Sequence, residues 1–207
     1  MTMIDNYNEM PLGLFLRIDA ILRERAGDEV GTQVGIIALL TGKTEDEVLD
    51  LPLAEYTDLA GKTAFLTNHC EPREIDTAAP GWNGLTPTLD FTKITTAQYI
   101  DFQTFAKDWP ATSVELLSCF LIPEGKTYNN GYDIAEVQGR IREMPFPLAL
   151  GYAAFFFGRF SASIADSLSY LGSVLKRTKN PAKRKALERK IREAEAALRN
   201  AGAGLLA

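Results

Sequence analysis

The sequence predicts a mainly α-helical fold, with a compact helical body, a small β element and a basic C-terminal helix. Three observations support this prediction. Apolar residues recur at helical spacing through most of the chain, prolines and glycines separate these segments, and the charge changes sign near the C-terminus. The 207 residues are 46% hydrophobic and 24% charged, values that are typical of globular proteins and exclude a disordered or collagen-like chain.

The charge distribution divides the chain more sharply than any motif does. Residues 1–175 hold 24 acidic and 12 basic side chains, a net charge of −12, whereas residues 176–207 hold 10 basic and 3 acidic ones. We therefore predict an acidic, mainly helical body over residues 1–172 and a basic helical tail over residues 173–207. The tail has three open interpretations: docking on its own acidic body, binding a partner, or binding phosphate directly. Phosphate binding is the least favoured, because the acidic remainder would repel nucleic acid.

The first 68 residues are predicted to form short helices joined by tight turns. Leu12–Ala26 has the apolar spacing of an amphipathic helix, and Val34–Leu40 is a short apolar run. Thr44 is a predicted N-cap, and Glu47 completes a capping box with it. Pro52 then begins another helix, which extends to about Leu66.

The middle of the chain contains the predicted β element. Leu85–Ile94 alternates apolar residues with threonines, and Pro87 restricts this segment to an edge strand. Thr95 or Thr96 caps the next predicted helix, and Val114–Leu121 forms a shorter one. Asp133 is the predicted N-cap of a helix that ends before two prolines.

A long core helix is predicted from Pro147 to about Leu171. The most apolar stretch, Met144–Gly158, has fifteen residues and two prolines. It is shorter than the roughly 20 residues that span a bilayer, so we expect a buried helix and no membrane partner. Without a basic, apolar leader, the two cysteines are expected to be free thiols in a reducing compartment.

The sequence offers little material for catalysis or metal binding. His69 is the only histidine, and with Cys70 and Cys119 it makes three candidate nitrogen and sulfur ligands, too few for a structural zinc site. The tripeptide Gly42-Lys43-Thr44 lacks the upstream glycine spacing of a phosphate-binding loop. We therefore predict a protein that is not an enzyme and that needs no cofactor and no metal.

Two groups of residues are candidates for protein interaction. The aromatic group lies on the long predicted helix, and its rings either pack in the core or form an interface: Phe155, Phe156, Phe157 and Phe160. The basic tail has a narrow apolar stripe, suited to a groove or a second helix, with charged flanks. The candidate residues of the tail are Arg184, Lys185, Leu187, Arg189, Lys190, Ile191, Arg192 and Leu198.

Two segments resemble the tail assembly chaperones of tailed phages. Leu39–Leu66, LLTGKTEDEVLDLPLAEYTDLAGKTAFL, is similar to a family segment with an LTG turn, an acidic helix and a further short helix. Ile122–Phe160 is similar to the later part of such proteins, or of related small phage structural proteins, in its GYD and FF features. Together the two segments cover about a third of the chain.

The resemblance implies a small helical protein that protects a tape measure protein while the phage tail polymerises around it. It implies action in the host cytoplasm during assembly and exposed apolar grooves, one of them on the aromatic helix. Two alternatives stay open: a structural component of the virion, and a nucleic-acid adaptor that acts through the basic helix. Self-association into a homo-oligomer also stays open.

Overall fold

The computed structural model describes residues 3–79, 81–178 and 180–206, apart from the side chains of residues 167, 193, 194 and 197–206. Helices cover 66% of the chain, and a two-stranded sheet is the β element. The predicted mainly α fold is therefore confirmed. The chain forms two compact units: unit 1 is Met1–Glu74 with Gly139–Gly151, and unit 2 is Ile75–Gln138 with Tyr152–Ala207.

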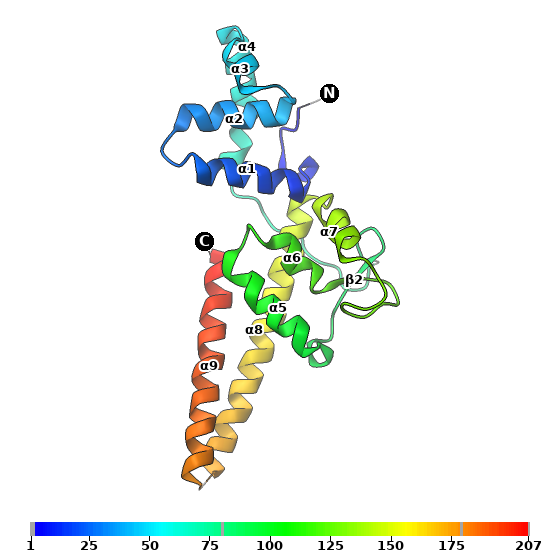
Figure 1. The fold of residues 1–207 in the computed structure, drawn as a ribbon, viewed down its shortest axis with the longest axis vertical. Coiled ribbons are helices and arrows are strands. Elements are labelled where there is room, and N and C mark those ends of the chain that lie inside the picture. Colours follow the sequence, from blue (N-terminus) through cyan, green and yellow to red (C-terminus); the bar gives the residue numbers. More distant parts are fainter. Residues whose placement is uncertain (1–2, 80, 179, 207) are drawn as a thin grey trace. The chain divides into compact units, whose positions relative to one another are not determined.

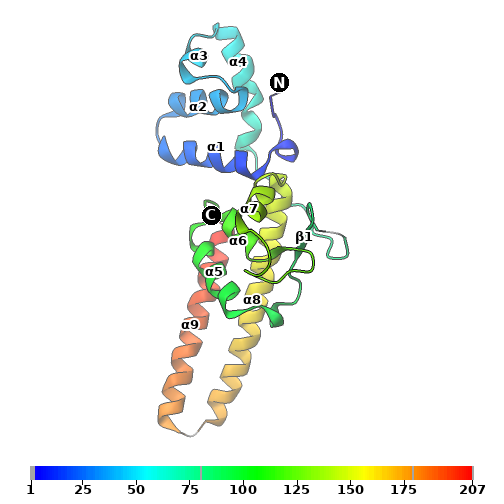
Figure 2. The same ribbon diagram turned by 45° about the vertical axis from the view of Figure 1, so that its right-hand side comes forward.

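Unit 1 is built around an antiparallel pair of helices, α1 and α2 (Figures 1 and 2). Its elements in chain order are η1 (Tyr7–Glu9), α1 (Leu12–Glu24), α2 (Glu29–Thr41), α3 (Glu45–Leu49), α4 (Leu53–Lys62) and η2 (Ala64–Thr67). The apolar run Val34–Leu40 forms the last two turns of α2. This helix begins earlier than the run, because the Asp28 side chain accepts a hydrogen bond from the Gly31 backbone N–H at 2.9 Å.

The turn between α2 and α3 has the chemistry that the sequence predicts. The Thr44 side chain accepts a hydrogen bond from the Glu47 backbone, and the Glu47 carboxylate accepts one from the Thr44 backbone at 2.7 Å. This reciprocal capping box lowers the pKa of Glu47. Before it, Gly42 ends α2 with a φ of 71°, in the left-handed region that favours glycine.

Replacing Gly42 by alanine is expected to lower the free energy of unfolding by about 1–2 kcal/mol, because an alanine Cβ is strained at this positive φ. The control is Gly61→Ala in α4, where a Cβ meets nothing within 4 Å, so we expect up to about 1 kcal/mol of stabilisation. Urea unfolding followed by circular dichroism measures both. Equal effects of the two substitutions would contradict the prediction.

Two apolar clusters hold unit 1 together. The first joins α1 to α2 through Met10, Ile18, Ile36 and Leu40, all at most 7% exposed. The second joins α2 to α3 and α4 through Val34, Ile37, Ala38 and Val48. Because both clusters use α2, this helix is apolar on opposite faces, as the central element of a small helical unit must be.

Unit 2 contains the sheet and the two longest helices. Its elements are β1 (Leu85–Pro87), η3 (Phe91–Lys93), α5 (Thr96–Phe105), η4 (Ala106–Asp108), α6 (Ser113–Ser118), β2 (Leu121–Pro123), most of α8 (Phe146–Arg177) and α9 (Pro181–Leu206). Helix α7 (Ile134–Arg142) crosses the division between the units. Thr95 caps α5 in a capping box with Gln98, which confirms the first of the two predicted caps.

The β element is smaller than predicted and has an unexpected partner. Strand β1 pairs antiparallel with β2, with Leu85 opposite Pro123 and Pro87 opposite Leu121. The rest of the predicted strand, as far as Ile94, turns into η3, because the Asp90 side chain accepts a hydrogen bond from the Thr92 backbone. A three-residue strand has no periodicity of its own, so β2 left no signal in the sequence.

Helix α8 has 32 residues and is the one helix in the described part of the chain that is long and apolar enough to cross a membrane by length and composition. Its most apolar window has a mean hydropathy of 1.3. The sequence predicts that this helix ends at about Leu171, but it continues to Arg177. Core helices of globular proteins pass the same test, and several α8 side chains are buried inside unit 2.

The compact units do not follow the charge boundary. Residue 172, the predicted end of the acidic body, lies inside α8, and the basic helix α9 begins only at Pro181. Within unit 2, α9 runs back antiparallel beside α8 (Figures 1 and 2) and contacts η4. We call the stretch from Ser161 to Leu206, which contains the second half of α8 and all of α9, the α8–α9 hairpin.

Candidate functional site

The aromatic group on α8 forms the core of unit 2. Phe156 and Phe157 are fully buried and Phe160 is 2% exposed. Their rings pack against Phe102 and Phe120, with centroid distances between 4.5 and 5.3 Å. These three rings present no surface to a partner, so the expectation of an exposed groove on the aromatic helix is corrected. Their close spacing on one helix reflects packing against α5, η3 and the turn between α6 and β2.

Phe155 is the exception in this group. It is half-buried, stacks edge-on against Phe156 at 5.5 Å and lies under the Arg159 guanidinium, whose Cζ is 5.3 Å from the ring centroid. A half-exposed ring covered by a cation is stable without a partner.

The apolar stripe of α9 faces the chain's own helix. Leu187 and Ile191 are half-buried, and Leu198 lies among the residues whose side chains are not described. The facing stretch of α8 has its own stripe at intervals of four, three and four residues: Ile164, Leu168, Leu171 and Leu175. This spacing is typical of a two-helix seam. The stripe of α9 therefore has a partner within unit 2.

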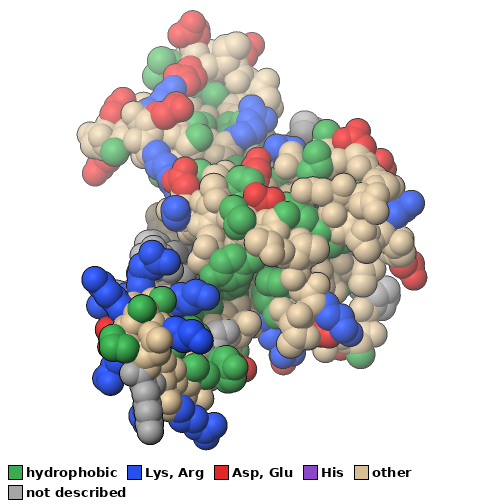
Figure 3. Space-filling view, turned by 60° about the horizontal axis from the view of Figure 1, so that its bottom comes forward, with side chains coloured by type: hydrophobic (Ala, Val, Ile, Leu, Met, Phe, Trp, Pro, Cys, Tyr) green, Lys and Arg blue, Asp and Glu red, His purple; other side chains and the backbone are tan. Residues whose placement is uncertain are grey.

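The charged side chains of α9 remain on the outside. Arg184, Lys185, Arg189, Lys190 and Arg192 are all exposed, and Figure 3 shows Lys and Arg side chains gathered around this helix. Arg184 pairs with Glu188 through Nε and Oε1 at 3.3 Å. All five predicted basic residues are therefore accessible to a partner, whereas the predicted apolar residues Leu187 and Ile191 are half-buried.

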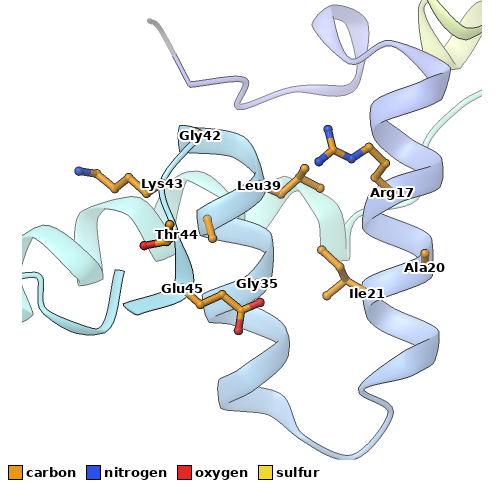
Figure 4. Close-up of a pocket in the computed structure, with 10 residues that line it drawn as sticks. Arg17, Ala20, Ile21, Gly35, Leu39, Gly42, Lys43, Thr44 and Glu45 are labelled. Carbon is orange, nitrogen blue, oxygen red and sulfur yellow. The ribbon is translucent and has the colours of Figure 1, made fainter. Parts of the chain in front are cut away.

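Unit 1 contains a groove that the sequence did not reveal. It has a volume of about 650 Å³ and lies between α1 and α2, with the turn before α3 at its edge (Figure 4). Its apolar lining comes from Ala20, Ile21, Ala38 and Leu39, and Ile21 and Leu39 project into the space between the helices.

An arginine holds one end of this groove. Arg25 donates from Nη1 to the Gly31 carbonyl at 2.7 Å and from Nη2 to Glu45 Oε1 at 2.6 Å, which ties the α1–α2 turn to the start of α3. The hydrogen bond from Arg25 lowers the pKa of Glu45, so the pair stays charged at neutral pH and is lost only as the pH falls through that lowered pKa.

Gly35 makes room for the arginine. A Cβ at this position would lie 3.1 Å from Arg25 Nη1, closer than most Cβ contacts, and 3.4 Å from Ile21 Cγ2, which is at van der Waals contact. Arg17 and Lys43 add positive charge to the groove lining (Figure 4). The groove therefore combines an apolar centre with charged edges, which is the composition that an amphipathic helix matches.

The two thiols lack the features of reactive cysteines. Burial raises the pKa of Cys119 to about 12 and that of Cys70 to about 11. Among the described residues, no group of three His, Cys, Asp or Glu side chains lies close enough to hold a metal ion. His69 is exposed on the segment that follows η2.

We expect Ellman's reagent at pH 8 to modify Cys70 slowly in the folded protein and to leave Cys119 unmodified until the chain unfolds. The reason is that the thiolate is the reacting form, and both thiols are overwhelmingly protonated at this pH. Cys119 is also fully buried, whereas Cys70 is only partly covered. Absorbance at 412 nm, with and without denaturant, measures both rates. Rapid modification of two thiols in the folded protein would contradict the prediction.

Comparisons with models of known protein families, with curated proteins and with solved structures found no match to this chain.

Proposed function

We propose that this protein is a non-enzymatic assembly factor that binds an amphipathic helical segment of another protein, as the tail assembly chaperones of tailed phages do. The observation that carries the proposal is the groove between α1 and α2 in unit 1. The partner proposed from the resemblance is a tape measure protein or another phage tail subunit.

The dimensions of the groove suit side chains from one face of a helix. Its volume of about 650 Å³ lies within the range of pockets that bind specific ligands, and four apolar side chains line it. Helices dock in such grooves by inserting apolar residues at intervals of three and four. Because Ala20 is exposed and has a small side chain, a helix can approach this side of α1 closely.

The charges at the edge of the groove specify the partner further. Arg17 and Lys43 line the groove, and Glu45, its one acidic lining residue, is engaged by Arg25. A segment with acidic side chains flanking its apolar stripe therefore complements this surface.

The segment that resembles the chaperone family supplies part of this groove. Leu39, Gly42, Lys43, Thr44 and Glu45 all line it, and all belong to the resembling segment Leu39–Leu66. The LTG turn and the acidic helix are thus features of the groove wall as well as of the local fold.

The test uses a substitution that fills the groove without disturbing the core of unit 1. Ala20 is exposed on α1, so Ala20→Trp is expected to fold normally and to block the groove. Photo-crosslinking from position 39, in cells that produce the complete set of phage proteins, identifies the bound segment. A synthetic peptide of that segment is then titrated against the purified full chain, with helix formation followed by circular dichroism.

The matched control is Ala97→Trp, an equal enlargement at an exposed helical position of α5 in unit 2. We expect Ala20→Trp to weaken peptide binding at least tenfold and Ala97→Trp to leave it unchanged. Equal binding by both variants would refute the groove as the binding site. A stoichiometric amount of this protein in purified particles would instead favour the virion-component alternative, because a chaperone is depleted there.

A further inference from the structure

We propose that the basic outer face of the α8–α9 hairpin binds the phosphate backbone of nucleic acid without sequence preference. This face centres on Lys185, Arg189 and Arg192, which lie on the side of α9 opposite its apolar stripe. Three further exposed basic residues, Lys183, Arg184 and Lys190, flank the stripe, and Lys190 lies beside Asp166 and Tyr170 of α8. The proposal is independent of the groove in unit 1, and either one can fail without the other.

The main feature that α9 presents to a binding partner is its positive charge. The described stripe residues Leu187 and Ile191 are half-buried on a helix that runs beside α8, so little of this stripe is free to lie in an apolar groove of another protein. No aromatic residue occurs in Pro181–Leu206, so α9 lacks the Trp and Phe anchors that are common in interfacial helices. The surface that remains is hydrophilic and positive.

The composition of the face favours nucleic acid over a protein partner. Protein interfaces have an apolar centre with a polar rim, whereas nucleic-acid interfaces are polar and strongly positive throughout. On the outer side of α9, Lys185 and Arg192 lie seven residues, or two helical turns, apart, with Arg189 between them, while the nearby Glu188 is paired with Arg184 at 3.3 Å. Lys176 and Arg177 extend the positive charge to the end of α8.

The spacing of these charges matches a polyphosphate. Lys183 to Arg192 covers about 14 Å of helix at 1.5 Å per residue. A DNA duplex carries one negative charge per roughly 1.7 Å of its axis, so this length faces about eight phosphates. The same length carries six basic side chains and Glu188, a net charge of +5, which neutralises more than half of those phosphates.

The two compact units differ in net charge, and the excess of acidic side chains lies in unit 1. Unit 1 holds 15 acidic and 8 basic side chains, a net charge of −7, whereas unit 2 holds 12 acidic and 14 basic ones, a net charge of +2. The overall charge of −5 therefore resides in unit 1. Helix α9 belongs to the unit that carries no net negative charge.

The experiment measures fluorescence anisotropy of labelled 20-nucleotide single-stranded DNA and of a 20-base-pair duplex with the full chain, from 25 to 300 mM salt. Binding is expected at low salt, with an affinity that falls linearly on a logarithmic salt scale. The double variant Lys185→Gln, Arg192→Gln is expected to weaken binding several-fold and to reduce the magnitude of the salt slope by about 2, since each lost phosphate contact contributes about 1.

The control removes the same charge elsewhere in unit 2, with Lys93→Gln and Lys126→Gln, both exposed and outside the hairpin. This variant is expected to retain the affinity and slope of the unchanged protein. The proposal is overturned if the full chain does not bind at 25 mM salt, or if the two double variants bind alike. It is also overturned if salt-sensitive self-association or binding to phosphatidylserine vesicles occurs without DNA binding, which would assign the face to an acidic protein surface or a membrane.

Discussion

Replacing Phe156 by alanine is expected to lower the free energy of unfolding of unit 2 by about 3–5 kcal/mol. Phe156 is fully buried and lies among the rings of Phe91, Phe120 and Tyr152, at centroid distances of 6.4, 5.0 and 6.0 Å. Removing the ring leaves a cavity in a core made of rigid aromatic side chains, which cannot collapse to fill it. Such a loss is a large part of the stability of a small unit.

The neighbouring Phe155 gives a matched control. It is adjacent in sequence and lies in the same helix, but it is only half-buried. Phe155→Ala is expected to cost no more than about 1.5 kcal/mol, the contribution of one aromatic pair. Tryptophan fluorescence during urea unfolding measures both, because Trp82 and Trp109 both belong to unit 2 and Trp109 packs edge-on against Phe157. Similar costs for the two variants would show that the ring of Phe156 is not a core residue.

Replacing Ile37 by alanine is expected to destabilise unit 1 by about 2–5 kcal/mol. Ile37 is fully buried in the cluster that joins α2 to α3 and α4. The matched control is Val30→Ala on the same helix, where the side chain is 67% exposed and the expected change is within about 0.5 kcal/mol. Hydrogen exchange of the α2–α4 amides measures the loss of protection directly.

The Ile37 variant also tests whether the two units unfold separately. Unit 1 contains no tryptophan, so its unfolding is followed by circular dichroism and hydrogen exchange while fluorescence follows unit 2. We expect Ile37→Ala to leave the fluorescence transition at its original urea concentration. A shift of both transitions by the same amount would show that the chain unfolds as one cooperative body.

The positions of helix caps were predictable because a cap is a local interaction. The hydrogen bonds of Thr44 with Glu47 and of Thr95 with Gln98 each join residues three apart. The sequence predicts the first pair, and for the second it predicts a cap at Thr95 or Thr96 without its partner Gln98. The extension of α8 from Leu171 to Arg177 was not predicted, because Gly172 is a common helix terminator. The neighbouring α9 covers this stretch, and packing between elements distant from a glycine overrides its local preference.

The candidate sites show the same division between local and long-range information. The basic surface of α9 was visible in the composition, since charges in one helix stay exposed unless they are paired. The groove was not visible, because its lining combines Arg17–Ile21 with Gly35–Glu45, and small residues such as Ala20 and Gly35 carry no functional signature. Only the antiparallel pairing of α1 with α2 shows that these small side chains meet.

The sequence by itself determined the mainly α class, the caps of α3 and α5, and the concentration of positive charge in the last helix, because propensity, capping and charge act over a few residues. The tertiary structure alone decided that four of the five phenylalanines on α8 are core, that the half-buried stripe of α9 lies beside α8, and that unit 1 has a groove. Those outcomes depend on which surfaces meet. A periodic apolar pattern shows that a face will be covered, but it does not identify the element that covers it.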